Sequence, residues 1–158
     1  MMHADHVNAF VQATKETFLA MCNLKVIAKY DEIKKVDGSI VDTDDLMAIC
    51  GLSGEVKGAT FLSTPLAVGQ RIISAFLMEE IKTVNYDLMD GFGEIVNIYA
   101  GAADGKIPNT RIDLALPSVL VGCGTKFFAK AGNPFIIVPM VIPDLGPMNM
   151  GISMEVKK

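Results

Sequence analysis

The sequence contains a polar stripe on a segment with helical periodicity between residues 85 and 105. Its members are spaced four, three, four and three residues apart, and they are Asp90, Glu94, Asn97, Gly101 and Asp104. At 100° per residue they fall within about 80° of one another on a helical wheel. Glu94 and Asn97 would present a carboxylate and a carboxamide side by side, so the two groups could enter a partner together.

The chemistry available to this pair is limited but useful. A carboxamide is not a general base at neutral pH, but it both donates and accepts hydrogen bonds and can therefore hold a water molecule. A carboxylate forms charge-assisted hydrogen bonds with a lysine or arginine. The alternative interpretation is an ordinary solvated helix face. Asn97 and Gly101 argue against it, because they cost roughly 0.5 and roughly 1 kcal/mol relative to alanine inside a helix.

A helix over Asn85 to Gly105 is predicted to position the stripe. Its opposite side carries apolar residues at the spacing that buries one helix face, and these are Leu88, Phe92, Ile95, Val96, Tyr99, Ala102 and Ala103. Asn85 is predicted to cap the first turn, and Gly105 to end the helix in the left-handed conformation. Pro108 then prevents the helix from continuing.

The other predicted elements indicate an α+β domain with a mostly antiparallel sheet packed against long helices. A first helix is predicted over 3–23, followed by a strand-like segment and a turn at Asp37-Gly38. Another helix is predicted to be capped by Thr64, to have Pro65 in its first turn, and to end near Met78. Strands are predicted over 46–53, 56–63, 111–116, 118–122, 135–142 and 148–156. We expect a single domain over 1–158.

Composition excludes several classes of function. Net charge is -4 and the 14 basic residues are scattered, so no nucleic acid partner is expected. Only two histidines are present, both near the N-terminus, which argues against a histidine-based triad or metal site. Residues 101–107 do not have the spacing of a phosphate-binding P-loop, and Gly91-Phe92-Gly93 lacks the third glycine of a dinucleotide-binding motif.

A location in the cytoplasm is expected from three features. No basic segment followed by an apolar run marks a signal peptide at the N-terminus. The most apolar run, 131–143, is too short for a membrane span and contains three prolines. The cysteines Cys22, Cys50 and Cys123 are odd in number and far apart, so we expect buried thiols. Because 51% of the residues are hydrophobic, we also expect an apolar interface with a partner or a second copy.

Two segments resemble a known family. Residues 93–101, Gly-Glu-Ile-Val-Asn-Ile-Tyr-Ala-Gly, are similar to the signature helix of the CheX branch of the CheC, CheX and FliY family of bacterial chemotaxis phosphatases, with Asp90 as the preceding acid. Residues 112–122 resemble the family's strand, proline, strand segment, and the resemblance extends over about 47–156. CheC-type members carry two such helices. Here the first helix offers Glu16 but has Leu19 where asparagine should be, so one site per chain is expected.

The resemblance implies a phosphatase that hydrolyses the aspartyl phosphate of a phosphorylated CheY-like response regulator. Asn97 would orient the attacking water and Glu94 would pair with the receiver's lysine, while Asp90, Gly101 and Asp104 would border the contact. No cofactor is expected on this chain, because Mg²⁺ would be held by the receiver. The resemblance also implies a homodimer formed by strand exchange, which light scattering would distinguish from a monomer.

Two other classes of function remain open at this level. A non-catalytic module could use the same helix to bind or sequester a response regulator without hydrolysis. A small-molecule sensor could have a pocket lined by some of the ten methionines, although methionine more often fills gaps in a core. A phosphate-release assay with a phosphorylated receiver separates these classes, because only a phosphatase accelerates the loss of phosphate.

Overall fold

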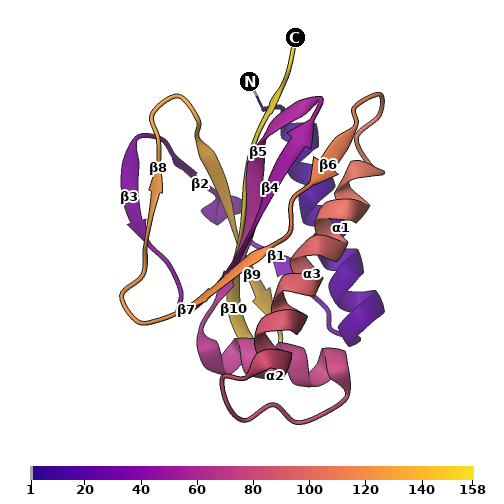
Figure 1. Cartoon of the computed structure of the whole chain (residues 1–158), viewed down its shortest axis with the longest axis vertical. Helices are drawn as coiled ribbons and strands as arrows, with labels where there is room; N and C mark the ends of the chain where they lie inside the picture. The colour runs from indigo at the N-terminus through magenta and orange to yellow at the C-terminus, as the bar shows by residue number, and fades with distance from the viewer. Residues whose placement is uncertain (1) are drawn as a thin grey trace.

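The computed structural model describes residues 2–158 and shows an antiparallel sheet covered by helices on one face (Figure 1). The strands of this sheet have the order β1-β9-β10-β5-β4-β6, with β2 pairing on β9 and β7 pairing on β4. Their bounds are β1 Ile27–Ala28, β2 Lys34–Val36, β4 Leu46–Gly54, β5 Val56–Thr64, β6 Ile112–Leu114, β7 Ser118–Val121, β9 Phe135–Ile142 and β10 Gly146–Val156. The predicted α+β class is therefore confirmed.

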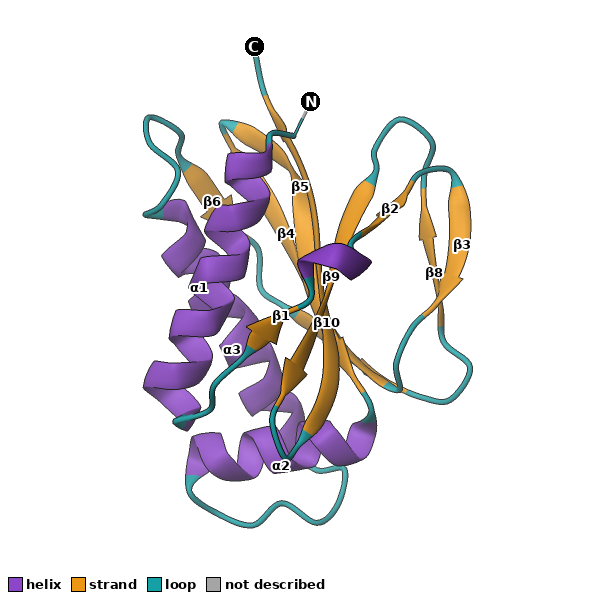
Figure 2. Ribbon diagram, turned by 180° about the vertical axis from the view of Figure 1, so that it is seen from behind, coloured by secondary structure: helices purple, strands orange, loops and turns teal. Residues whose placement is uncertain are grey.

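Three α-helices cover one face of the sheet: α1 Ala4–Cys22, α2 Leu66–Leu77 and α3 Tyr86–Asp104. Helices α1 and α3 lie side by side, and α2 crosses near their ends (Figures 1 and 2). The main core lies between these helices and the sheet. Its largest fully buried side chains include Phe10 and Phe18 of α1 and Phe92 and Tyr99 of α3. The periodic apolar residues of the sequence thus form the faces that the helices bury.

The other face of the sheet is covered by two strands that were not predicted, β3 Ser39–Asp42 and β8 Lys126–Ala129. They pair only with each other, from Ser39 opposite Ala129 to Asp42 opposite Lys126. Figure 2 shows this two-stranded layer on the side of the sheet away from the helices. Beneath it lies a second core that contains Phe61 and Phe127 in edge-to-face contact, with ring centroids 5.2 Å apart.

The ends of the helices follow the sequence only in part. Asn85 is the N-cap of α3 as predicted, because its Oδ1 accepts a hydrogen bond from the Leu88 amide at 2.9 Å. The predicted Thr64 cap of α2 is wrong. Thr64 ends strand β5, and its hydroxyl donates instead to the carbonyl of Pro147 at 2.8 Å, so Pro65 precedes the helix without a side-chain cap.

The predicted left-handed Gly105 is also wrong. Its φ is -65°, and the chain leaves α3 through right-handed turns in which the Lys106 amide donates to the carbonyl of Ala103 at 3.0 Å. The left-handed residue of this connection is Asn109, with φ of 58°. The amides after the helix therefore bond back to its last carbonyls, which is a common alternative to a left-handed cap.

Two features bear on the other sequence predictions. Cys22 and Cys50 are buried free thiols, but Cys123 is exposed because it lies in the turn between β7 and β8. The prediction that all three thiols are buried is therefore wrong for Cys123. Over residues 2–158, no helix combines the length and the apolar character that crossing a membrane requires.

Candidate functional site

The polar stripe is positioned by the buried side of α3. Phe92, Ile95 and Tyr99 are fully buried against the sheet and the neighbouring helices, and this fixes the rotation of the helix. With that face inward, Glu94 is exposed and Asn97 is partly exposed on the other side. The predicted amphipathic pattern therefore has the orientation that the candidate site requires.

A buried hydrogen-bond chain holds the middle of α3 to the sheet. The hydroxyls of Tyr99 and Thr60 are 2.8 Å apart, and Thr60 donates to the carbonyl of Gly151, also at 2.8 Å. Since a threonine hydroxyl has only one proton, Tyr99 must be the donor to Thr60. Burial raises the pKa of Tyr99 far above its ordinary value, so the phenol stays protonated and keeps this role. Tyr99 lies two residues from Asn97, so these hydrogen bonds restrain the segment of α3 that carries the site.

An open groove of about 270 Å³ runs beside the exposed face of α3. The helix contributes five lining residues, namely Met89, Asp90, Gly93, Glu94 and Asn97. The opposite wall is made by Leu116, Pro117 and Val119, where the chain passes from β6 to β7. The groove therefore brings three of the predicted site residues together with a wall from another part of the chain.

Gly93 allows the two walls to meet closely. A Cβ placed on Gly93 would lie 3.1 Å from a methyl carbon of Val119 and 3.7 Å from the Cβ of Pro117. The first distance is tighter than ordinary packing, so a side chain here would press on the strand wall. The absence of a side chain at Gly93 thus sets how near β7 lies to the helix.

The polar groups at the centre of the stripe are free for a partner. Among the described residues, the side-chain hydrogen bonds of α3 and its cap are made by Asn85, Tyr99 and Asp104, and none is made by Glu94 or Asn97. Neither of these two side chains is in an ion pair within residues 2–158. The carboxylate and carboxamide therefore face solvent with their hydrogen-bonding capacity unused inside the chain.

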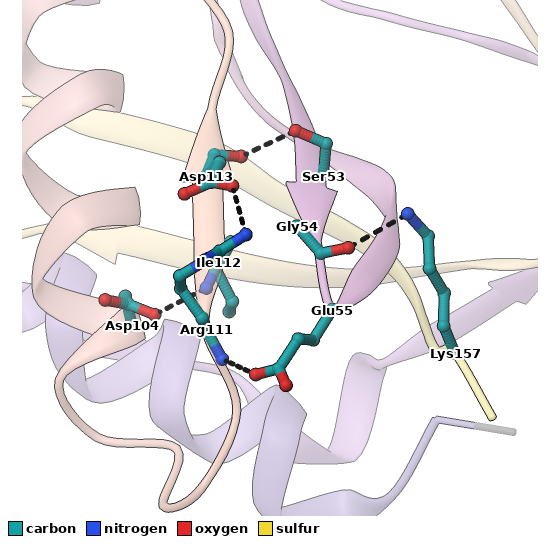
Figure 3. Close-up of polar contacts among 8 residues, drawn as sticks. All are labelled: Ser53, Gly54, Glu55, Asp104, Arg111, Ile112, Asp113 and Lys157. Carbon is teal, nitrogen blue, oxygen red and sulfur yellow. Dashed lines mark hydrogen bonds and ion pairs between the residues drawn. The ribbon is translucent and has the colours of Figure 1, made fainter.

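The last two members of the stripe lie outside this groove. Gly101 is exposed one turn beyond Asn97, and the nearest side-chain atom to an added Cβ would be Leu114 Cδ1 at 3.8 Å. Asp104 is used within the chain, because its Oδ1 accepts a hydrogen bond from the Ile112 amide at 2.9 Å (Figure 3). That contact joins the end of α3 to the start of β6.

A surface network extends this connection to the β4–β5 turn (Figure 3). The Arg111 amide donates to a carboxylate oxygen of Glu55 at 2.6 Å, and the Arg111 guanidinium lies 3.4 Å from the Asp113 carboxylate. Lys157 donates to the carbonyl of Gly54 at 2.9 Å. These groups are exposed, so each pair alone contributes little to the stability of the fold. Together they hold the chain at the point from which it continues to the groove wall.

The first helix offers no second pair of this kind. Glu16 lies on α1 and forms an ion pair with Lys106 at 2.8 Å, which links α1 to the turn after α3. Leu19, one turn further, is 59% exposed. Within residues 2–158, no group of three or more histidine, cysteine, aspartate or glutamate side chains is arranged to hold a metal ion.

Sequence reasoning did not identify the strand wall of the groove. The sequence pattern places Leu116 and Pro117 only in a strand, proline, strand segment. The available signal was Pro117 itself, because a proline cannot donate to the strand ladder and therefore marks an interruption between two short strands. The residues of the wall could then have been assigned to the site only by knowing that β7 passes beside α3.

The family model for the chemotaxis phosphatase CheX matches residues 46–141. None of the curated proteins gives a significant sequence match.

Solved structures share the fold. A CheC-like superfamily protein from Shewanella sp. PV-4 has a TM-score of 0.85 at 20% identity, covering 98% of this chain and 99% of its own. CheX from Desulfovibrio desulfuricans has a TM-score of 0.84 at 21% identity, covering 95% and 99%. The CheX–CheY–BeF₃–Mg²⁺ complex from Borrelia burgdorferi has a TM-score of 0.77 at 20% identity, covering 97% and 99%.

Proposed function

This chain belongs to the CheX family of chemotaxis phosphatases, and we propose that it hydrolyses the aspartyl phosphate of a CheY-like response regulator. The observation that carries the proposal is the pairing of Glu94 and Asn97 in one open groove, with both side chains free of partners among the described residues. The Borrelia burgdorferi complex, in which a CheX is bound to CheY, supports the choice of partner.

Asn97 is assigned to water positioning. Its carboxamide can accept a hydrogen bond from a water molecule and donate one to a neighbouring oxygen, which would hold the water in line with phosphorus. Phosphoryl transfer depends mainly on positioning and electrostatic stabilisation, and a glutamine has the equivalent part in GTPases. The restraint of α3 at Tyr99 suits this role, because a loosely held side chain would align the water poorly.

Glu94 is assigned to the receiver's lysine. The two groups would form a charge-assisted pair that fixes the helix in register on the receiver. Mg²⁺ would be held by the receiver and would neutralise charge on the phosphoryl group there. Asp90 in the groove and Gly101 one turn beyond Asn97 would flank the contact. Asp104 is left out of the docking surface, because its carboxylate already fixes the start of β6.

A homodimer is a further part of the proposal. Ile40 on β3 and Phe128 on β8 lie opposite each other in register, and they are 64% and 61% exposed. Two large apolar side chains side by side on a surface are typical of a contact with another molecule. A second copy of the chain would remove this surface from water.

Asn97→Ala tests the catalytic assignment. The variant should lower the acceleration of dephosphorylation about 100-fold or more, because the attacking water is no longer held in line. Folding should be unchanged, since alanine favours a helix slightly more than asparagine does. The rate of phosphate loss from a phosphorylated receiver measures the effect. Asn8→Ala, an exposed asparagine of α1, is the matched control and should retain the full rate.

Two results would contradict parts of this proposal. Full acceleration by Asn97→Ala would remove the water-positioning role while leaving the phosphatase activity to other residues. A wild-type chain that binds the phosphorylated receiver without accelerating phosphate loss would instead be a response-regulator-binding module.

A further inference from the structure

Leu116 is an exposed apolar side chain at the candidate site. It lies between β6 and β7 and is 92% exposed, yet it lines the same groove as Glu94 and Asn97. A single exposed leucine is common on protein surfaces. This one differs because it stands on the wall that faces the two polar groups assigned to catalysis and binding.

The backbone that carries Leu116 is held firmly. The Ala115 amide donates to the carbonyl of Gly51 at 2.9 Å, and the buried thiol of Cys50 lies 3.2 Å from the carbonyl of Ala115, to which it donates. On the other side, Pro117 has a fixed φ and packs beside Gly93 of α3. Leu116 therefore projects into solvent from a segment that β4 and α3 hold in place from both sides.

The groove is chemically divided. The α3 side carries the carboxylates of Asp90 and Glu94 and the carboxamide of Asn97, and no lining residue is basic. The opposite side is apolar at Leu116, Pro117 and Val119. A partner that fits both sides needs a cation facing α3 and an apolar surface beside it. The first requirement is met by the receiver lysine in the proposed function, on which this inference rests.

We propose that Leu116 is the apolar contact that secures the phosphorylated receiver beside its phosphorylation site, and that this contact contributes to the affinity for the receiver. An apolar side chain on a rigid segment loses little conformational freedom when it is covered, so it suits a binding contact. An apolar contact beside a polar pair also helps to exclude water from that pair. Leu116 touches the receiver's surface but not the reacting atoms, so its effect is on binding.

Leu116→Ser tests this assignment. In assays of phosphate loss over a range of receiver concentrations, KM should rise roughly tenfold or more, because burial of a leucine side chain is lost. The kcat should stay within about twofold, since only interactions specific to the transition state change it. Leu116→Met keeps an apolar side chain and should restore most of the affinity. Leu120→Ser, on the 47% exposed Leu120 of β7 outside the groove lining, should leave KM unchanged.

The outcomes separate this inference from the proposed function. If the wild type accelerates phosphate loss and Leu116→Ser has an unchanged KM, the docking role is wrong while the phosphatase proposal stands. A fall in kcat without a change in KM also overturns it, because that pattern places Leu116 in the chemical step. If the wild type shows no acceleration, the phosphatase proposal fails. Direct binding of the receiver with Mg²⁺ and beryllium fluoride then decides the inference, which requires a roughly tenfold or greater loss of affinity in Leu116→Ser.

Discussion

Gly93 and Gly101 of α3 offer a matched pair of alanine substitutions on one helix. Glycine costs about 0.8–1 kcal/mol relative to alanine in a helix interior, so both substitutions gain a similar intrinsic stabilisation. They differ in the space available for the new methyl group. At Gly101 the Cβ would meet Leu114 Cδ1 at an ordinary 3.8 Å, whereas at Gly93 it would lie 3.1 Å from a methyl carbon of Val119.

The two substitutions should therefore differ in stability, and only Gly101→Ala should be more stable than the wild type. Gly101→Ala should stabilise the chain by about 1 kcal/mol, which corresponds to a rise in Tm of about 2–4 °C for a protein of this size. Gly93→Ala gains the same helix propensity. Its methyl group, however, must fit into the closely packed contact with Val119 of β7, at a cost of about 1–3 kcal/mol. Its net effect should range from about zero to a loss of about 2 kcal/mol.

Urea unfolding of the wild type and both variants measures this difference. A change in the midpoint at constant m reports stability alone, because m follows the surface exposed on unfolding. The reasoning is refuted if Gly93→Ala is as stable as Gly101→Ala. That result would mean that Val119 moves aside without cost, and Gly93 would then not set the distance between α3 and the wall of the groove.

Two further predictions concern buried polar groups. Tyr99→Phe should lower the free energy of unfolding by about 1 kcal/mol, since it removes the bond to Thr60 but leaves Thr60 bonded to the sheet; no loss in urea unfolding would contradict the assigned hydrogen-bond chain. Burial raises the pKa of Cys22 from 9.0 to about 11. Between these two pH values the unfolded chain has lost a proton that the native chain keeps, so stability should fall as pH rises through this window. Urea unfolding between these pH values should show that the stability of Cys22→Ala falls less steeply with pH than that of the wild type. An equal fall would refute the raised pKa of Cys22 as its cause.

The sequence predicts an element well where the local pattern of residues is enough to determine its structure. Helix α3 could be placed because its apolar residues recur at helical spacing over five turns and because Asn85 has the side chain of an N-cap. The same pattern assigned Glu94 and Asn97 to a solvent-facing side without any knowledge of their neighbours. Strands β9 and β10 were also predicted close to their observed bounds, since they are long and apolar.

The strands β3 and β8 could not be found in this way. Each has only four residues, and each pairs with a partner more than eighty residues away in the sequence. In β8, Phe127 faces the second core while its neighbour Phe128 is exposed, so both faces are aromatic and the alternation that marks a half-buried strand is lost. Their pairing is decided by tertiary contacts, which a local pattern does not contain.

The errors at helix ends have a related cause. Thr64 has the right type for a cap, but β5 extends through it, and its hydroxyl is turned to donate to the carbonyl of Pro147 in β10 instead of accepting from a helix amide. Gly105 is free to adopt the left-handed conformation, yet the next amides already reach the last carbonyls of α3 without it. In both places a competing hydrogen bond outweighs an intrinsic preference.

The restraint of α3 bears on the water-positioning role proposed for Asn97. Holding a water in line demands that its ligand stay fixed, because small displacements cost rate steeply. For the proposed role of Asn97, the restraint comes from other residues of α3, namely the Tyr99 hydrogen bonds on its buried side and the Asp104 contact with β6 at its end. Asn97 therefore needs no partner of its own within the chain, and its carboxamide remains available for water and receiver. The backbone at Asn97 can be rigid while its side chain stays unbonded, because the helix is restrained through its other residues.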